Sequence, residues 1–391
     1  MSREKVKLAV AVYLRYYLSP SETFVYRQLK GISAAFHPIV LTSRASNLDL
    51  FPTGLVFAKG KGFCGKVGTR LFRAAAGRYS AITPSQYGYW KRMLDIHQVR
   101  LVHAHFGHFG LDILPVARSL GIPLLVTFHG FDASQLLNDK RYTADLERLF
   151  AYAHVITVSR NMAERLSAYG LEDGRRTVHY IGVPVEEFEF VRRPAIAEKL
   201  IKGEPLTFLQ VSNFVEKKGH KYTVEAFAEY FRGRPEDRLI CAGDGPLRRE
   251  IEALATSLGI RDKVDFKGRV VKSQVGDLMR AADVFVHHSV TARNGDMEGI
   301  PTVIMEAMSM GLVVVSTRHS GIPELIDDGV DGFLVPERDV PAYVEKLRGL
   351  VSSAAGVGER ARKKIEDKFN MSKQNLELQK IYQRMIDGSR V

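Results

Sequence analysis

The sequence predicts an α/β protein with two doubly wound, Rossmann-like domains, and three observations support this. The chain has 391 residues and is 45% apolar, which is more than one typical domain holds. Short, nearly continuous apolar runs alternate with amphipathic stretches, as in parallel sheets that helices cover on both faces. The alternation stops once, in a charged segment with three prolines at 183–205, and then starts again.

The first half of the alternation predicts an N-terminal domain, residues 1–190. Its strand-like runs include "VRLVHAHF" and "PLLVTFH", and together they cover residues 6–14, 38–43, 99–106, 123–129, 154–159 and 176–182. Amphipathic stretches at 23–35 and 161–169 have the apolar spacing of helices. The strands read as apolar on both faces, so we expect a buried parallel sheet.

The second half predicts a C-terminal domain, residues 206–371. Strand-like runs cover residues 206–213, 237–243, 263–268, 283–290, 312–318 and 332–335, and helices are expected at 221–231, 247–258, 303–310 and 341–350. We interpret 183–205 as the linker and expect the last helix, within 372–391, to cross back to the N-terminal domain. Ligands of such sheets bind at the carboxyl ends of the strands, so a central cleft between two facing domains is the expected site.

The net charge of +12 is placed unevenly along the chain. Residues 1–190 carry 24 Lys and Arg against 15 Asp and Glu, and no acid lies between Asp49 and Asp95. The basic segment, residues 59–92, has aromatic residues among its positive charges and suits an anionic membrane surface. A plain solvated face and nucleic acid are the alternatives, and we expect no nucleic-acid partner. The predicted location is the cytoplasm, peripherally at the inner membrane face.

Cysteine content and hydropathy fit this location. Cys64 and Cys241 are too far apart in sequence for a CxxC motif or a zinc cluster, so a reduced cytoplasmic protein is the simplest interpretation. No apolar run reaches the roughly 18 residues of a membrane-spanning helix.

The segment "RNGDMEGIPTVIMEAM", residues 293–308, carries two acids in an unusual arrangement. Pro301 suits the first turn of a helix, so Glu298 would precede the helix and Glu306 would lie within it. The free N–H groups of Thr302 and Val303 would form an anion site, with an acid on each side. A nucleotide sugar fits this arrangement, because it offers hydroxyls on both sides of its diphosphate, on the sugar and on the ribose. The alternatives are dipole compensation by Glu298 and a surface-facing Glu306.

Neighbouring segments strengthen the nucleotide-sugar hypothesis through a family resemblance. The motifs "VSNFVEKKGHKYTVEAFA", "CAGDGPLRREIEALATSLG", "VDFKGRV", "EGIPTVIMEAM" and "GIPELIDDGVDGFLV" follow one another through residues 206–335. This set resembles the retaining glycosyltransferases of family 4, which have the GT-B fold, and in particular bacterial enzymes of exopolysaccharide, capsule or lipopolysaccharide assembly. The resemblance implies that the N-terminal domain binds the acceptor and the C-terminal domain binds the nucleotide sugar.

The resemblance also assigns roles around the two acids. Glu306 matches the acid that holds the donor ribose, and Glu298 matches the acid that contacts the donor sugar. The backbone amides expected at the sugar or the diphosphate are those of Gly299, Ile300 and Thr302. Pro301 stands where many family members have glycine, and it removes one N–H donor.

The diphosphate clamp departs from the family pattern. Lys218 matches the lysine that neutralises the diphosphate, but its usual companion arginine, five residues earlier, is Asn213 here. Arg293 and Arg318 are candidates to supply the missing positive charge.

The resemblance assigns further residues to the site. His129 matches the histidine that lines the transfer site, and the alternative is a histidine that ends a strand for packing. Arg269 and Val270 are the expected neighbours of the nucleobase, and Gly243 of "GDGP" is expected at the donor unless it forms a plain turn. Glu324 is assigned either to the donor or to a helix start.

The N-terminal loop differs from the Gly-Gly pair of many family members. Ser21 or Thr23 is the expected N-cap of the helix at 23–35, where a hydroxyl could also meet a phosphate or the acceptor. Asp132 is expected to cap the next helix.

The predicted reaction is transfer of a sugar from a nucleotide-sugar co-substrate to a glycan or lipid-linked acceptor, with retention by same-face attack. No D-x-D pair is present, and we expect no metal and no other cofactor. A retaining glycoside hydrolase is an alternative because it also uses two carboxylates. A nicotinamide enzyme is disfavoured because G-x-G-x-x-G is missing after the first strand. A non-catalytic protein that binds nucleic acid or membrane is the remaining alternative.

Overall fold

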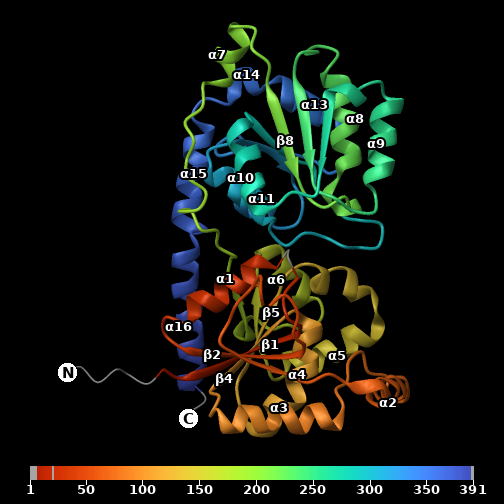
Figure 1. Cartoon of the computed structure of the whole chain (residues 1–391), viewed down its shortest axis with the longest axis vertical. Helices are drawn as coiled ribbons and strands as arrows, with labels where there is room; N and C mark the ends of the chain where they lie inside the picture. Colours follow the sequence, from red (N-terminus) through yellow and green to blue (C-terminus); the bar gives the residue numbers. More distant parts are fainter. Residues whose placement is uncertain (1–6, 20–21, 389–391) are drawn as a thin grey trace, which may run out of the picture. The chain divides into compact units, whose positions relative to one another are not determined.

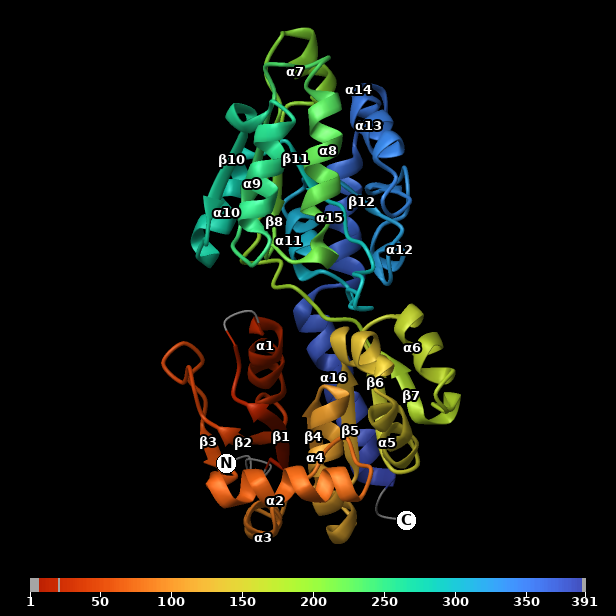
Figure 2. The same cartoon turned by 90° about the vertical axis from the view of Figure 1, so that its right-hand side faces the viewer.

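The chain forms two compact units, shown in Figures 1 and 2. A computed structural model describes residues 7–19 and 22–388. The first unit comprises Met1–Gly182 and Ser372–Val391, and the second comprises Val183–Met371. Each unit has its own parallel sheet and its own buried apolar cluster.

The sheet of the first unit has seven parallel strands in the order β3-β2-β1-β4-β5-β6-β7. Its strands are β1 (Ala9–Tyr16), β2 (His37–Arg44), β3 (Leu55–Ala58), β4 (Leu101–His105), β5 (Leu124–Phe128), β6 (His154–Thr157) and β7 (Arg176–Val178). Its α-helices are α1 (Thr23–Ile32), α2 (Gly62–Ala75), α3 (Pro84–Ile96), α4 (Gly107–Leu120), α5 (Lys140–Phe150), α6 (Arg160–Ser167) and α16 (Met371–Gly388).

The C-terminal helix α16 is part of the first unit's core. Tyr382 is fully buried, and its hydroxyl lies 2.6 Å from Nδ1 of His103 on β4. Its ring also packs edge-on against Phe36, with the ring centroids 5.5 Å apart. These contacts explain why Ser372–Val391 groups with residues far away in the sequence.

The second unit repeats the same architecture with six parallel strands, in the order β10-β9-β8-β11-β12-β13. The strands are β8 (Thr207–Val211), β9 (Arg238–Ala242), β10 (Val264–Gly268), β11 (Val284–His287), β12 (Val313–Thr317) and β13 (Phe333–Val335). The α-helices are α7 (Ile196–Ile201), α8 (His220–Tyr230), α9 (Arg248–Ser257), α10 (Lys272–Ala281), α11 (Thr302–Ser309), α12 (Ile322–Leu325), α13 (Val340–Arg348), α14 (Leu350–Ser353) and α15 (Val357–Lys368).

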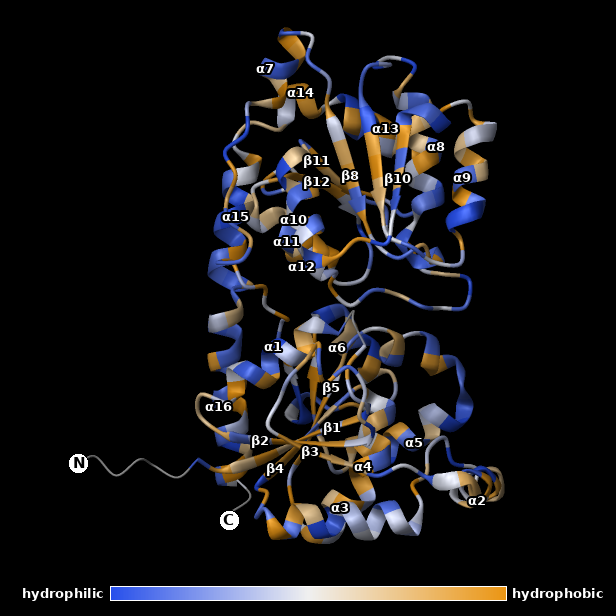
Figure 3. Ribbon diagram, in the orientation of Figure 1, coloured by the Kyte–Doolittle hydropathy of each residue, from blue (hydrophilic) through white to orange (hydrophobic). Residues whose placement is uncertain are grey.

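The strand order places a topological switch point in each sheet. The order reverses between β1 and β4 in the first unit and between β8 and β11 in the second. The strands are mostly apolar along their length, as Figure 3 shows, because helices cover both faces of each sheet. Ligands of such sheets bind beyond the carboxyl ends of the strands at the switch point.

The predicted α/β fold with two Rossmann-like sheets is confirmed. Each strand-like run expected from the sequence contains a strand, but β3 was not expected. It is a four-residue edge strand without a fully buried residue, so its apolar pattern is weak.

The segment at 183–205, expected as a linker, packs within the second unit. The Arg193 guanidinium donates to the backbone carbonyls of Met279, Ala282 and Met310. The segment also contains α7, so the division of the chain falls at its start, between Gly182 and Val183. Among the described helices, none is both long enough and apolar enough to cross a bilayer.

Candidate active site

Two loops meet at the switch point of the second unit. The first follows β8 and contains a short 3₁₀ helix, Glu216–Lys218. Gly219 ends it with a left-handed backbone, φ 63°, and a Cβ there would lie 1.6 Å from the carbonyl oxygen of His288. The second loop follows β11, and the N–H of Val290 donates to the carbonyl of Lys217 at 3.0 Å. Only glycine permits this close approach of the two backbones.

The loops carry Lys218 and Glu298, the two residues that are expected to do the main chemistry. Nζ of Lys218 lies 2.5 Å from Oε1 of Glu298, and Glu298 is only 7% exposed. Burial raises the pKa of the Glu298 carboxyl, but Lys218 and then Lys217 outweigh burial and lower it to about 2. Glu298 is therefore an anion at neutral pH, and it can accept hydrogen bonds but cannot act as an acid.

Helix α11 begins directly after this loop. Pro301 is the N-cap residue, with φ −66° and ψ 116°, so it precedes the helix and does not occupy its first turn as expected. The helix starts at Thr302, whose N–H and those that follow are the groups that an α-helix leaves without an intrahelical partner. Glu306 is half-buried one turn further on. Gly299 and Ile300 are buried on the same stretch, between Glu298 and the helix.

Several buried polar atoms lie on the same strand ends. Both ring nitrogens of His287, Oε1 of Gln210 and Oγ of Ser289 have no hydrogen-bond partner within the described chain. Burial and then the charge of Lys218 lower the pKa of His287 well below its ordinary value, so the ring is neutral at neutral pH. Buried polar atoms without partners are costly, so they indicate a site that a polar ligand can satisfy.

The cations around the site are largely paired. Asn213 is exposed and replaces the expected arginine with a neutral amide. Arg293 pairs with Glu216 at 3.2 Å but its side chain is 93% exposed, whereas Arg318 pairs with Asp328 at 2.5 Å. Lys217, which the sequence had not singled out, pairs with Asp296 at 3.0 Å and lies near enough to Glu298 to lower its pKa.

The expected nucleobase neighbours lie at adjacent strand ends. Arg269 is exposed and Val270 is half-buried, directly after β10. Gly243 follows β9 with φ 140°, and a Cβ there would lie 2.0 Å from the carbonyl oxygen of Ser212. Its N–H donates to the carbonyl of Gly268 at 2.8 Å, so this glycine packs two strand ends together. A cavity of about 580 Å³ begins at the next residue, Asp244.

His129 is in the first unit, at the carboxyl end of β5. Its Nε2 lies 3.1 Å from Nδ1 of His105, and its ring packs against Phe24 of α1 and against Phe106. Burial and the neighbouring His105 lower the pKa of His129 well below its ordinary value. Its Nδ1 is buried without a hydrogen-bond partner among the described residues. These observations describe a neutral ring that can orient a polar group.

The N-terminal loop corrects one expectation. Thr23 is the first residue of α1, whereas Glu22 is the N-cap residue and makes no side-chain cap bond. The Glu22 carboxylate instead accepts the N–H of Ser19 at 2.6 Å, which fixes the turn before the helix. Ser21 lies outside the described residues.

Asp132 does not cap the next helix as expected, because it lies inside the short 3₁₀ helix Phe131–Ala133. Its buried carboxylate accepts the N–H groups of Gly107, His129 and Gly130 at 2.7, 2.9 and 3.1 Å. Burial raises its pKa, although these three hydrogen bonds oppose the rise. Asp132 therefore holds the backbone of His129 against the start of α4.

The sequence did not single out two residues near Glu298. His319 follows β12 and Glu337 follows β13, so both lie at the same sheet edge as Glu298. Their position after neighbouring parallel strands was the available signal. Glu324, which was assigned to the donor or to a helix start, lies in the short helix α12.

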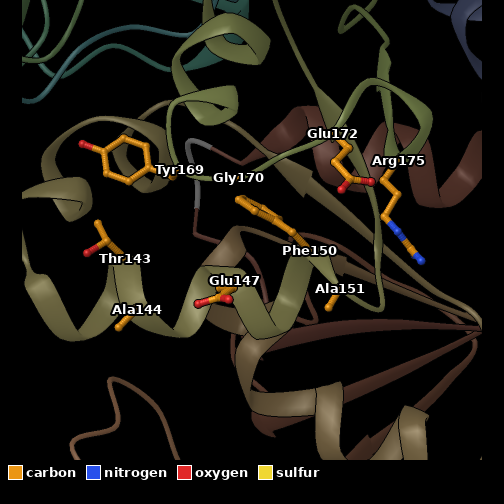
Figure 4. A pocket seen from close by; sticks show the side chains of 9 residues that line it. All are labelled: Thr143, Ala144, Glu147, Phe150, Ala151, Tyr169, Gly170, Glu172 and Arg175. Atoms are coloured by element: carbon orange, nitrogen blue, oxygen red, sulfur yellow. The ribbon is translucent and has the colours of Figure 1, made fainter.

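A cavity of about 640 Å³ lies on the first unit, away from the predicted residues. It is lined by α5 and by the segment around Tyr169–Arg175, and Figure 4 shows Glu147, Phe150 and Tyr169 in it. None of the predicted site residues lines it.

Two known families match the chain. Residues 21–187 match Glycosyltransferase Family 4, and residues 191–368 match Glycosyl transferases group 1. The two matches together span most of both units.

Relatives and solved structures agree with these matches. The chain is 34% identical to the putative colanic acid biosynthesis glycosyltransferase WcaL of Escherichia coli strain K12, over 72% of this chain and 69% of that protein. It is 33% identical to the amylovoran biosynthesis glycosyltransferase AmsK of Erwinia amylovora, with the same coverage. Its fold is similar to that of Anabaena HepE, solved with UDP and glucose, with a TM-score of 0.75, 18% identity and coverage of 96% and 100%.

Proposed function

Because the chain belongs to the family 4 glycosyltransferases and has the GT-B fold, we propose that it transfers a sugar from a nucleotide-sugar donor to a glycan or lipid-linked acceptor. The proposed transfer retains the anomeric configuration and uses no metal ion. The observation that carries this proposal is the pair of half-buried Lys218 and buried Glu298 beside the start of α11, at the switch point of the second unit.

The proposed chemistry begins with the departure of the nucleoside diphosphate. Negative charge grows on the diphosphate as the anomeric C–O bond breaks, and Lys218 with the N–H groups at the start of α11 would stabilise it. The acceptor hydroxyl attacks from the face that the diphosphate leaves. Its proton passes to the departing phosphate oxygen, so no protein base is required.

Glu298 and Glu306 have binding roles in this proposal. Glu298 is ionised, so it would accept hydrogen bonds from donor-sugar hydroxyls, and Glu306 would accept those of the ribose. When the donor binds, the Lys218 ammonium group would contact the diphosphate as well as Glu298. The neutral ring of His129 would orient the sugar without taking a proton.

The sequence relatives support a pathway, and one solved structure of similar fold suggests which donors to test first. WcaL is described as a putative colanic acid biosynthesis glycosyltransferase and AmsK as an amylovoran biosynthesis glycosyltransferase, so we propose bacterial exopolysaccharide synthesis as the pathway. HepE was solved with UDP-glucose, which makes UDP-sugars the first donors to test.

A panel of UDP-, GDP- and ADP-sugars tests the proposed function. Nucleotide release, measured by mass spectrometry with the purified protein, identifies the donor even if water replaces the acceptor. Lys218→Ala and Glu298→Gln are expected to abolish transfer while the folded chain still gives its normal circular dichroism. Full activity in both variants would refute the site assignment.

We also propose that the basic segment 59–92 binds an anionic membrane surface, where a lipid-linked acceptor would lie. Its helix α2 exposes a stripe of apolar side chains at helical spacing, with Phe63 83%, Val67 47% and Leu71 66% exposed. Lys66 and Arg70, beside this stripe, are exposed and form no ion pair within the described chain. Figures 1 and 2 place α2 at the outer margin of the first unit.

An exposed helix with adjoining apolar and basic faces has the pattern of an interfacial helix. Flotation with phosphatidylcholine vesicles, with and without phosphatidylglycerol, tests this at low salt. Absence of binding to the phosphatidylglycerol vesicles would contradict the proposal.

A further inference from the structure

The loop that carries Glu298, residues 288–301, joins β11 to α11 and contains no helix or strand. A loop of this length needs fixed contacts if one of its carboxylates is to be held in place. The structure supplies them from two neighbouring strand ends, through His319 after β12 and Glu337 after β13.

His319 holds the Glu298 end of the loop. The backbone N–H of Glu298 donates to Nε2 of His319 at 3.1 Å, and Nδ1 of His319 lies 2.6 Å from Oε1 of Glu337. A backbone N–H can only donate, so Nε2 is the acceptor and Nδ1 carries the proton. His319 therefore donates to Glu337, and its tautomer is fixed by the backbone of Glu298.

Glu337 holds the other end of the same loop. Its Oε2 accepts the N–H of Thr291 at 2.7 Å, while its Oε1 accepts from His319. Burial raises the pKa of Glu337, but the hydrogen bonds from His319 and from the Thr291 N–H outweigh it and lower the pKa. The ionised Glu337 carboxylate thus holds Thr291 by a direct hydrogen bond and holds Glu298 through the imidazole of His319.

The backbone around Glu298 is fixed on both sides. The hydroxyl of Ser320 donates to the carbonyl of Glu298 at 2.7 Å, and the N–H of Gly321 donates to that of Gly299 at 3.3 Å. Ser320 has a left-handed backbone, φ 47°, which is unfavourable for a non-glycine residue. His319 is fully buried, so water does not compete for its hydrogen bonds.

We propose that His319 and Glu337 are positioning residues that hold Glu298 at the donor sugar, an inference that rests on the proposed function. Neither residue touches the donor in this proposal. His319 holds the backbone of Glu298, and Lys218 holds its carboxylate. Glu337 ties the loop to the end of β13 through Thr291 and His319.

The test compares His319→Ala with His319→Gln, which restores one donor and one acceptor in a single side chain. With the nucleotide sugar, His319→Ala is expected to lower kcat/KM by about 10²-fold, the loss typical of a misplaced substrate contact. Affinity for the free nucleoside diphosphate is expected to stay unchanged, because Glu298 is assigned to the sugar. His319→Gln is expected to recover part of the loss, and Glu337→Gln is expected to lose less than His319→Ala.

Hydrogen exchange gives a second measurement that does not depend on activity. In His319→Ala, backbone exchange within 291–301 is expected to accelerate, while exchange in the first unit stays the same. The matched control is His179→Ala, which removes another buried histidine that contacts the backbone. Nε2 of His179 lies 2.9 Å from the carbonyl oxygen of Gln374. It should cost stability without changing exchange in the loop.

The outcomes separate the two proposals. Unchanged loop exchange in both His319→Ala and Glu337→Gln would overturn the positioning role, as would an equal loss of affinity for nucleotide and nucleotide sugar. A wild-type protein that binds no nucleotide sugar would refute the proposed function, while the exchange experiment would still decide how the loop is held. If His319→Ala does not fold, His319→Gln and Glu337→Gln carry the same measurements.

Discussion

Lys218 and Glu298 form an ion pair between the loops that follow β8 and β11, with Nζ 2.5 Å from Oε1. Glu298 is buried and Lys218 is half-buried. The sequence predicted that both residues face the donor, one at the diphosphate and one at the sugar. The structure shows in addition that the two side chains neutralise each other's charge. In the proposed function, donor binding would therefore compete with this contact.

The pair predicts a non-additive effect on stability. Lys218→Ala leaves the Glu298 carboxylate buried without its partner, which is expected to cost about 3–5 kcal/mol of unfolding free energy. Adding Glu298→Gln removes the unpaired charge, so the double variant is expected to be more stable than Lys218→Ala alone. Calorimetry on the four proteins of the cycle measures this. Strictly additive losses would show that the pair contributes no coupling.

Trp90 provides an internal control for that cycle. It is the only tryptophan of the chain, is fully buried in α3, and packs edge-on against Tyr13 with ring centroids 5.0 Å apart. Its fluorescence therefore reports unfolding of the first unit. A shift of this transition in the Lys218 or Glu298 variants would mean that the effect is not confined to the second unit.

A second prediction concerns pH. Burial lowers the pKa values of His105 and His108 to about 3, below the ordinary histidine value near 6.5. The unfolded chain then takes up these protons first, so stability is complete above about pH 6.5 and falls as the pH drops toward 3. Glu298, with a pKa of about 2 in the folded chain, adds nothing to this loss above about pH 5. Below that pH the unfolded chain also protonates this carboxyl, so stability falls further.

His108→Gln removes one of these two protonation sites. Urea unfolding of the first unit, followed by Trp90 fluorescence at pH 7, 6 and 5, is expected to show a shallower loss of stability in the variant, by about 1.4 kcal/mol per pH unit at most. The same slope in wild type and variant would mean that His108 is protonated equally in both states.

A third prediction tests the missing positive charge. Asn213 is exposed at the end of β8, where related enzymes are expected to have arginine. Asn213→Arg is expected to lower the KM for the nucleotide sugar up to about tenfold, because a charge-assisted hydrogen bond to phosphate is stronger than a neutral one. Asn213→Gln is the control, since it adds length without charge. Equal KM values for the two variants would indicate that Lys217 or another cation already completes the clamp.

The sequence predicted the strand ends that carry the site, because apolar runs followed by polar loops define them locally. Family 4 membership and the GT-B fold were also predicted and are confirmed. The pairing of Lys218 with Glu298 could not be predicted, because no local pattern relates two residues on different loops. His319 and Glu337 were missed for the same reason. Each looks like an ordinary polar residue after a strand until the strand order β11-β12-β13 places their loops at the same sheet edge as Glu298.

Local expectations failed where a neighbouring side chain changed the outcome. Thr23 has the right chemistry for an N-cap, but it is the first helical residue of α1 and Glu22 is the N-cap residue. The Glu22 carboxylate accepts the N–H of Ser19 in the turn before the helix. Arg318 stays a candidate for the missing charge, although it pairs with Asp328 in this structure. The hydrolase alternative is not favoured, because the chain belongs to a glycosyltransferase family and Glu298 is paired with a lysine.

A fourth prediction concerns Gly243. A Cβ at this position would lie 2.0 Å from the Ser212 carbonyl oxygen, and φ is 140°, so Gly243→Ala must move β9 away from the loop after β8. We expect a loss of several kcal/mol in the second unit and weaker donor binding. Gly233→Ala is the control in the same unit, because its nearest contact would be an ordinary 3.8 Å. Equal melting temperatures for the two variants would contradict the close packing.

The last prediction assigns membrane binding to the apolar stripe of α2. Leu71 is 66% exposed on this helix, and Leu376 is 56% exposed on α16, so they form a matched pair of exposed leucines. Leu71→Ser is expected to lower partitioning onto phosphatidylglycerol vesicles roughly tenfold, since inserting a leucine side chain is worth about 1.5 kcal/mol or more. Leu376→Ser is expected to partition as wild type does. Lys66→Gln with Arg70→Gln should weaken binding only at low salt, because salt screens exposed charges. If the two leucine variants bind equally, α2 does not insert, and the basic segment is a solvated face.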